Sequence, residues 1–397
     1  MRHVVLRVAK LAAVLILLAV GAVGTLLAIM WHEHTSPVVL PSPTGAFALG
    51  RAQYAWINPK TSEELAVWIW YPARSSSTAR PAEYLPAPWR TALRARQGTF
   101  MRSFFKRDAI AVGTHSESNA AVAPDRRAYP VVVLRPGGSA LTIDFTSLAE
   151  DLASHGYIVA GFDAPGRSFV IVTSDGRAIA RAPENNVENA NGNLSDPVVG
   201  RLLAMWTSDT RFVVDQLERV NDGDLSTPFA GRMDVARLAI VGHSFGGATA
   251  LQFCHEDTRC RAAIDMDGIP FGTVVSDGLQ KPAMLLLSDH SREMADPASQ
   301  RVAQEIQSIY ERLSPPRLLA TIRTANHFTF SDQSLLNSHA ALALLRLTGF
   351  GGLDARRGLA ISADFVRTFF DVALNGASPA ALTDLSERYT DLVTISR

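Results

Sequence analysis

A serine between glycines, placed after an apolar run and before a helix-like segment, is the feature that most constrains the fold. The apolar run at 238–241 leads into the sequence GHSFGG at 242–247, and the segment at 248–251 favours the start of a helix. We therefore expect a strand, a sharp turn and a helix in this order. Glycines fit because larger side chains would clash in so tight a bend, whose strained backbone lifts the serine hydroxyl above the sheet. We predict that Ser244 is a nucleophile; the alternative is a structural turn whose serine has no chemical role.

Two backbone N–H groups are predicted to stabilise an oxyanion next to Ser244. The first belongs to Phe245, at the expected helix start, where the helix dipole favours negative charge. The second is expected in the glycine-rich turn after the apolar run at 131–134, because α/β hydrolases take their second donor from the turn after the third strand. Gly137 and Gly138 are both candidates, and we prefer Gly138 by position. The alternative is a Pro-Gly-Gly sequence that only turns the chain.

A serine nucleophile needs a histidine base, which in this fold follows the serine and an acid along the chain. We predict His327, which lies in a loop after a late apolar run, where a base can face the turn. For His290, directly after an expected strand, and for His339, in an expected helix, we prefer a histidine without a catalytic role. His243, inside the turn, is expected to point away from the site.

The acid that orients the base is expected in its ionised form at the carboxyl edge of the sheet. Asp265 and Asp267 close the expected strand at 262–264, and Asp289 closes the next strand. Alternate side chains of a strand point to opposite sides, so only one of Asp265 and Asp267 can face His327. The residues alone do not decide which of these three acids orients His327.

Strands that alternate with helices predict a mostly parallel central sheet with helices on both faces. Apolar runs at 131–134 and 157–162 enclose a helical segment at 144–154, and the serine-bearing strand follows a further helical pattern. Parallel strands joined by right-handed crossovers give an α/β fold. The 397 residues, 47% of them hydrophobic, suffice for one large α/β domain or two small ones.

Two segments are predicted to be insertions in this domain. Residues 72–127 are rich in Arg, Ser, Ala and Pro, contain a helical patch at 89–105, and are expected to lie beside or over the sheet. Residues 169–199 hold five asparagines and few apolar side chains, which makes the segment too long and too polar for a plain connection. We interpret it as a lid near Ser244; the alternative is a surface insertion without a role.

An uncharged stretch at 11–31 predicts a membrane-spanning helix. Its length matches the hydrocarbon core of a bilayer, whereas a cleaved signal peptide has a shorter apolar region and a small-residue cleavage site. Basic residues precede the stretch, so the positive-inside rule leaves the N-terminus in the cytoplasm. We predict a cytoplasmic stub and signal anchor at 1–36, and an extracytoplasmic catalytic domain at 37–397 that begins with an extended linker at 37–45. Secretion after cleavage is the alternative.

Cysteine use and charge narrow the chemistry further. Cys254 and Cys260 are the only cysteines, and in an oxidising compartment we expect them to form a disulfide; two packed thiols are the alternative. Their spacing matches no zinc motif, and the sequence carries no metal cluster or cofactor fingerprint, so we predict neither a metal nor a cofactor. The 38 basic and 38 acidic residues give no basic field, which argues against a nucleic-acid partner.

The segment at 239–272, which holds GHSFGG and the acids of the following strand, resembles the type II platelet-activating-factor acetylhydrolases. The resemblance extends through 151–160 and through 321–323 with His327, so it covers most of the domain after the apolar stretch. It implies an α/β-hydrolase fold and places the acid at Asp267, which lies in a Met-Asp-Gly sequence.

The resemblance also implies an activity: a calcium-independent serine esterase that removes short or oxidised acyl groups from the sn-2 position of phospholipids. One departure is Arg-Pro-Gly-Gly at 135–138, where family members usually carry His-Gly-x-Gly. We therefore expect the oxyanion loop and the acyl pocket to differ from those of the family. A general carboxylesterase or polyester hydrolase of the same fold is the alternative function. A non-catalytic binding protein is a further alternative, although Ser244, Asp267 and His327 are all present.

Overall fold

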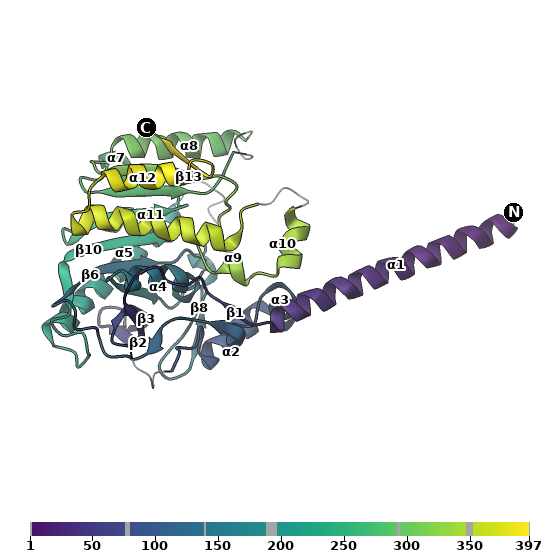
Figure 1. Cartoon of the computed structure of the whole chain (residues 1–397), viewed down its shortest axis with the longest axis horizontal. Helices are drawn as coiled ribbons and strands as arrows, with labels where there is room; N and C mark the ends of the chain where they lie inside the picture. The colour runs from purple at the N-terminus through teal and green to yellow at the C-terminus, as the bar shows by residue number, and fades with distance from the viewer. Residues whose placement is uncertain are drawn as a thin grey trace.

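A ten-stranded sheet forms the centre of the domain (Figure 1). The computed structural model describes residues 2–75, 80–138, 140–187, 197–291, 294, 296–346 and 352–396. The strand order across the sheet is β14 (Val393–Ser396), β13 (Arg317–Ile322), β12 (Ala283–Leu287), β11 (Cys260–Met266), β10 (Met233–His243), β6 (Tyr129–Arg135), β7 (Ile158–Asp163), β3 (Glu63–Ala73), β2 (Ala48–Asn58) and β5 (Glu117–Ser118).

Six neighbouring strands of the sheet, β7, β6, β10, β11, β12 and β13, all run parallel, as the alternation of strands and helices predicted. The antiparallel pairs lie towards the edges: β14 pairs with β13, and the β2–β3 hairpin joins the sheet through β7. Because the parallel strands share one direction, their carboxyl ends meet at the same edge of the sheet.

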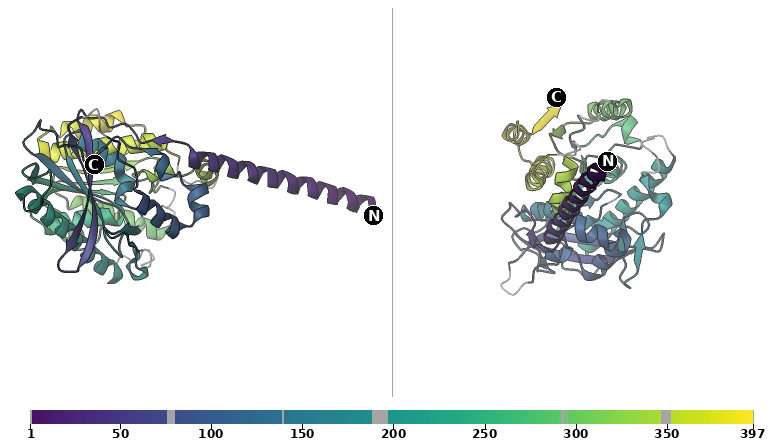
Figure 2. Two further views of the ribbon diagram at one scale, coloured as in Figure 1. Left: turned by 90° about the horizontal axis from the view of Figure 1, so that it is seen from below. Right: turned by 90° about the vertical axis from the view of Figure 1, so that its right-hand side faces the viewer.

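Helices cover both faces of the sheet, which explains the continuous apolar runs of its central strands (Figure 2). In β6, Val132 and Leu134 join the core on one face, and Val131 and Val133 join the core on the other, as expected for a period of two. The first core is covered by α4 (Thr146–Ser154), α11 (Ala355–Asn375) and α12 (Ala380–Arg388), and the second by α5 (Pro197–Asp222), α6 (Phe245–Glu256) and α8 (Pro297–Glu311).

The segment at 72–127 has more structure than its composition suggested. The predicted helical patch is two helices, α2 (Ala87–Gln97) and α3 (Thr99–Phe105), because Gly98 adopts a φ of 82° that ends the first helix. The predicted linker at 37–45 is not only extended chain: β1 (Val38–Val39) pairs in parallel with β4 (Val112–Gly113). The other described elements include the hairpin of β8 (Val170–Val172) and β9 (Ala178–Ala180), and the short helices α7 (Val274–Asp277), α9 (Gln333–Leu336) and α10 (His339–Arg346).

The N-terminal helix α1 (Arg2–Thr35) is longer than the uncharged stretch at its centre and extends away from the domain (Figures 1 and 2). Among the described residues it is the one helix long and apolar enough to cross a membrane, with a mean hydropathy of 2.7 over its most apolar part. Membrane anchors and signal sequences share this property. The last turns of α1 contact the domain at α3 and α10 and at residues that adjoin these helices.

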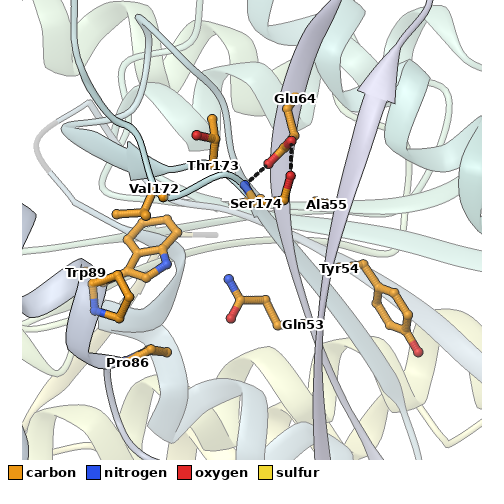
Figure 3. A pocket seen from close by; sticks show the side chains of 12 residues that line it. Gln53, Tyr54, Ala55, Glu64, Pro86, Trp89, Val172, Thr173 and Ser174 are labelled. Atoms are coloured by element: carbon orange, nitrogen blue, oxygen red, sulfur yellow. Dashed lines mark hydrogen bonds between the residues drawn. The ribbon is translucent and has the colours of Figure 1, made fainter.

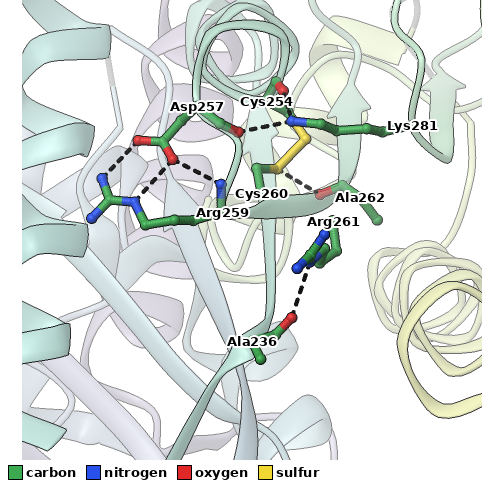
Figure 4. Close-up of a disulfide and its surroundings, with 8 residues drawn as sticks. All are labelled: Ala236, Cys254, Asp257, Arg259, Cys260, Arg261, Ala262 and Lys281. Atoms are coloured by element: carbon green, nitrogen blue, oxygen red, sulfur yellow. Dashed lines mark hydrogen bonds and ion pairs between the residues drawn. A yellow bond between two sulfur atoms is a disulfide. The ribbon is translucent and has the colours of Figure 1, made fainter.

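The predicted disulfide is present: Cys254, near the end of α6, is bonded to Cys260, the first residue of β11 (Figure 4). Both cysteines are fully buried. Nearby, the ammonium of Lys281 donates to the backbone carbonyls of Cys254 and Asp257, at 2.6 and 2.8 Å. The bond therefore closes a short, hydrogen-bonded connection between the helix and the next strand.

Candidate active site

Ser244 separates β10 from α6 in a strained backbone conformation. Its φ of 57° and ψ of −128° are unfavourable for a residue with a side chain. The close approach of neighbouring backbone explains the glycines on both sides: a Cβ at Gly242 would collide with the carbonyl group of Gly246. A Cβ at Gly246 would in turn collide with the backbone of Arg135 and Pro136. The strand, sharp turn and helix expected from the sequence are therefore all present.

Asp267 and His327 are in direct contact at the carboxyl edge of the sheet. Asp267 follows β11, His327 follows β13, and Nδ1 of His327 lies 2.7 Å from Oδ2 of Asp267. The side chain of Asp267 is 1% exposed, whereas that of His327 is 42% exposed. The carboxylate is thus buried beneath an imidazole whose other nitrogen is free to face solvent or a substrate.

A second histidine and a serine also bind the Asp267 carboxylate. Nε2 of His290 lies 3.0 Å from Oδ1, the backbone N–H of Ser288 donates to the same oxygen at 2.7 Å, and the Ser288 hydroxyl donates to Oδ2 at 2.8 Å. Burial alone would raise the pKa of Asp267, but the hydrogen bonds and charges of His290 and His327 hold this pKa well below its usual value. Asp267 is therefore ionised at neutral pH.

His290 was expected to be a surface or core histidine with satisfied hydrogen bonds rather than the base, but its contact with Asp267 was not predicted. The available signal was its position directly after β12, the strand next to β11 in the sheet. Neighbouring parallel strands bring the residues that follow them together at one edge. Nothing in the sequence indicates that both histidines bind the same carboxylate.

The other candidate acids make different contacts and do not hydrogen-bond to His327. Asp265 lies beneath α6: its Oδ1 accepts the N–H of Gly268 at 2.8 Å, and a Cβ at Gly247 would collide with its carboxyl group. Burial raises the pKa of Asp265 well above its usual value. Asp289 accepts the N–H of Thr324 at 2.8 Å. Of the three carboxyls, Asp267 is the one that contacts His327.

The prediction that His243 points away from the site is wrong. Its ring centroid lies 4.5 Å from that of His327, and its Nε2 donates to the backbone carbonyl of His327 at 2.8 Å. Burial, followed by the charge of His327, lowers the pKa of His243 to about 3, so the ring is neutral. Alternation along the strand failed here because the side chain is directed by packing in the turn. The contact brings His327 beside the turn that carries Ser244.

The two proposed oxyanion donors lie in the expected elements. Phe245 is the first residue of α6, where backbone N–H groups lack partners within the helix. Gly137 packs against the nucleophile, since a Cβ there would lie 2.8 Å from Cβ of Ser244. Gly138 follows it, and its carbonyl accepts a hydrogen bond from Nη1 of Arg181 at 2.9 Å. The loop that would bind the oxyanion is therefore held by a cation.

Arg181 belongs to the predicted insertion at 169–199, which begins with the β8–β9 hairpin. Further along, Nδ2 of Asn185 donates to the carbonyl of Gly166 at 2.8 Å, and Val187 packs beside Phe245 in an apolar cluster. Residues 188–196 of the insertion, which include three of its asparagines, lie outside the described residues. The described part contacts both the Gly138 loop and the start of α6.

Apolar side chains flank the turn on the side of α5. The ring of Trp206 packs edge-on against Phe245 at 5.1 Å between centroids, and Phe271 lies 6.0 Å from Phe245. Among the described residues, the hydroxyl of Ser244 makes no hydrogen bond to His327; in unliganded hydrolases such contacts often tighten only when substrate binds. Apolar side chains therefore lie on one side of Ser244, and the contacting pair of His327 and Asp267 lies at the same edge of the sheet.

A cavity of about 330 Å³ opens elsewhere on the domain, between the β2–β3 hairpin, the start of α2 and the β8–β9 hairpin (Figure 3). Its lining includes Trp89 and Tyr54, and the Glu64 carboxylate there accepts the N–H and hydroxyl of Ser174. Ser244, Asp267 and His327 are not in its lining. This cavity is separate from the candidate active site.

The sequence model of the family described as "Platelet-activating factor acetylhydrolase, isoform II" matches residues 33–190 and 214–375. The chain belongs to this family. It is 25% identical over 286 residues to a probable 1-alkyl-2-acetylglycerophosphocholine esterase of Arthroderma benhamiae, covering 68% of this chain and 67% of that protein. It is also 25% identical over 232 residues to the platelet-activating factor acetylhydrolase of Cavia porcellus, covering 54% of this chain and about half, 52%, of that protein.

Esterases with other named substrates are also similar to the chain. A cutinase of Thermobifida fusca is 24% identical, with 58% of this chain and 60% of that protein covered. The structure of a ferulic acid esterase from Streptomyces cinnamoneus superposes with a TM-score of 0.69 and 26% identity, covering 91% of this chain and all of that one. The α/β-hydrolase fold is therefore established, and the chain is a hydrolase of the esterase class.

Proposed function

We propose that the chain is a serine esterase in which Ser244 is the nucleophile, His327 the base and Asp267 the acid that orients it. The observation that carries the proposal is the 2.7 Å contact between the ionised carboxylate of Asp267 and Nδ1 of His327, beside a strained serine turn. This contact leaves Nε2 of His327 as the atom that accepts the serine proton. The three side chains come from three loops at one edge of the sheet, in the order known for this fold.

The reaction follows from these roles. The Ser244 oxygen attacks the ester carbonyl while Nε2 of His327 takes the hydroxyl proton, and the N–H groups of Phe245 and Gly138 bind the oxyanion. When the tetrahedral intermediate collapses, the carbon–oxygen bond to the alcohol breaks and His327 returns the proton to the leaving alcohol. A water molecule, deprotonated by the same base, then hydrolyses the acyl-enzyme and restores the serine.

For the substrate we propose phospholipids with a short or oxidised acyl group at the sn-2 position. Two things support this choice: the family to which the chain belongs, and an apolar helix that would bring the site to a bilayer. A general carboxylesterase or polyester hydrolase is the second candidate. The chain is 24% identical to a cutinase and 26% identical to a ferulic acid esterase, which is close to its 25% identity to the acetylhydrolases. The departure from His-Gly-x-Gly at 135–138 bears on both, since it lies in the loop next to the acyl group.

We propose in addition that α1 anchors the domain to the membrane, with the domain on the extracytoplasmic side. The end of α1 is built into the domain: the Glu33 carboxylate accepts the Ser338 hydroxyl at 2.6 Å, and Nδ1 of His34 contacts the carbonyl of Lys106 at 2.8 Å. The guanidinium of Arg107 also donates to the Glu33 carbonyl at 2.9 Å. Such contacts favour a helix that stays with the domain over a leader that is removed.

The test is hydrolysis of two matched substrate series by the full chain in detergent micelles. One series runs from para-nitrophenyl acetate to palmitate, and the other compares phospholipids with acetyl or hexadecanoyl at sn-2. We expect cleavage of the short esters and of the acetyl phospholipid, with activity abolished in Ser244→Ala. Cleavage of simple esters alone would favour the general esterase, and equal inactivity of both proteins would favour the binding protein.

A further inference from the structure

The Asp267 carboxylate binds two histidines, one through each of its oxygens. Oδ2 binds Nδ1 of His327 at 2.7 Å, and Oδ1 binds Nε2 of His290 at 3.0 Å. Ser288 completes the arrangement with one hydrogen bond to each oxygen. The carboxylate therefore accepts four hydrogen bonds, two on each oxygen. An acid that only orients one base needs only the hydrogen bond to that base, so the role of His290 calls for a separate explanation.

The surroundings of the two histidines distinguish their roles. His327 stacks on His243, the residue before Ser244, so its ring lies at the turn. His290 instead follows β12, and its Nε2 also lies 3.1 Å from the hydroxyl of Ser288. Since the Nε2 of His290 is directed at the carboxylate, it is not available to take a proton from a substrate or from Ser244.

We propose that His290 is a positioning residue that fixes the Asp267 carboxylate for His327. The inference rests on the proposed roles of Ser244, Asp267 and His327. A donor on Oδ1 prevents the carboxylate from rotating away from His327, and a misplacement of about 1 Å in such a group can cost about a hundredfold in rate. His290 touches neither substrate nor the reacting atoms and acts only through Asp267.

Two substitutions test the hydrogen bond from His290 to the carboxylate. In His290→Gln the side-chain amide can still donate to Oδ1, whereas His290→Ala removes the donor. For para-nitrophenyl acetate we expect His290→Ala to lose about tenfold in kcat at little change in KM, and His290→Gln to retain a kcat close to that of the wild type.

A matched control is available at another histidine–aspartate pair. Nε2 of His255, in the last turn of α6, lies 3.4 Å from Oδ2 of Asp277. We expect His255→Gln to leave both kcat and KM as in the wild type. If His290→Ala behaves like this control, or if it loses kcat and glutamine at the same position does not restore it, the proposal is wrong.

A spectroscopic readout keeps the inference separate from the proposed function. In the Ser244→Ala background, the Nδ1–H proton of His327 bonded to Asp267 is expected to give a downfield NMR resonance. We expect this resonance to broaden or move in His290→Ala and to persist in His255→Gln. An unchanged resonance in His290→Ala overturns the role of His290 even if the chain proves to be an esterase; failure of Ser244→Ala to abolish hydrolysis would instead overturn the proposed nucleophile.

Discussion

The backbone carbonyl of His327 accepts a hydrogen bond from Nε2 of His243 at 2.8 Å, so the residue before Ser244, the proposed nucleophile, is bound to the loop that carries the proposed base. His243 is buried, whereas His327 is partly exposed. A buried side chain with few alternative positions thus fixes one end of the loop. The reach of His327 towards Ser244 depends on this contact as well as on Asp267.

Replacing His243 is expected to remove a pH dependence of stability. The pKa of His243 is lowered to about 3 by burial, whereas a histidine in the unfolded chain has a pKa of about 6.5. Below about pH 6.5 the unfolded chain binds a proton that the folded chain does not, so the free energy of unfolding falls by about 1.4 kcal/mol per pH unit towards pH 3. Urea unfolding of His243→Gln should show a shallower fall than the wild type; equal slopes would contradict the assignment.

The three strand-end carboxyls should respond differently to the same isosteric change. Asp267→Asn is expected to lower kcat by about 10³ to 10⁴, because the neutral amide cannot stabilise the imidazolium and no longer enforces the His327 tautomer with the proton on Nδ1. Asp265→Asn and Asp289→Asn are expected to stay within about tenfold of the wild type, since neither carboxyl hydrogen-bonds to His327. Steady-state kinetics on a short ester measures these losses. A loss of kcat in Asp265→Asn as large as in Asp267→Asn would contradict the assignment of the acid to Asp267.

Arg181 is expected to support the oxyanion loop through its hydrogen bond to the Gly138 carbonyl. Loss of an oxyanion donor costs about 10² to 10³ in kcat, and loosening the loop that carries one should cost less, about tenfold, in Arg181→Gln. The control is Arg177→Gln in the same hairpin, where the exposed guanidinium pairs with Asp175. Comparable kcat values for the two variants would show that the insertion does not support the loop.

Removing the disulfide is expected to affect stability and leave catalysis intact. The double substitution Cys254→Ser and Cys260→Ser opens a loop of only a few residues, so the chain-entropy estimate of the loss is about 2 kcal/mol. The bond joins the far end of α6 to the start of β11, while Ser244 precedes the opposite end of that helix. Thermal unfolding should show a lower Tm with kcat retained; a large loss of kcat would indicate that the bond also holds the turn.

The order of strands and helices was predictable because the apolar runs of buried strands and the glycines of tight turns are both local features of the sequence. Buried parallel strands such as β6 require continuous apolar runs, and the tight turn at Ser244 requires glycine on both sides. The main errors of detail have two different causes. Short-range backbone geometry at Gly98 interrupts the helical patch at 89–105. The linker at 37–45 contains a strand whose partner lies more than seventy residues away, and no local pattern indicates such a pairing.

The site was predictable in part for the same reason. The serine follows from its turn, and the family resemblance selected Asp267 from three acids that the residues alone left open. His243 was interpreted wrongly, and the partner of His290 was not predicted, because their contacts are made across the sheet edge, between loops that follow different strands. Nothing within a few residues of either histidine in the sequence specifies the carbonyl or the carboxylate that it binds.

The sequence by itself determined the α/β class, the strained serine turn, the disulfide pair and a helix long enough to span a bilayer, since each depends on side-chain pattern or steric limits over a short stretch. Tertiary structure alone decided that two histidines share one carboxylate and that Arg181 reaches the Gly138 loop, and it brought Asp267, which the resemblance had selected, into contact with His327. These contacts depend on the register and twist of parallel strands, which bring distant loops within hydrogen-bonding distance and leave no periodic trace in the sequence.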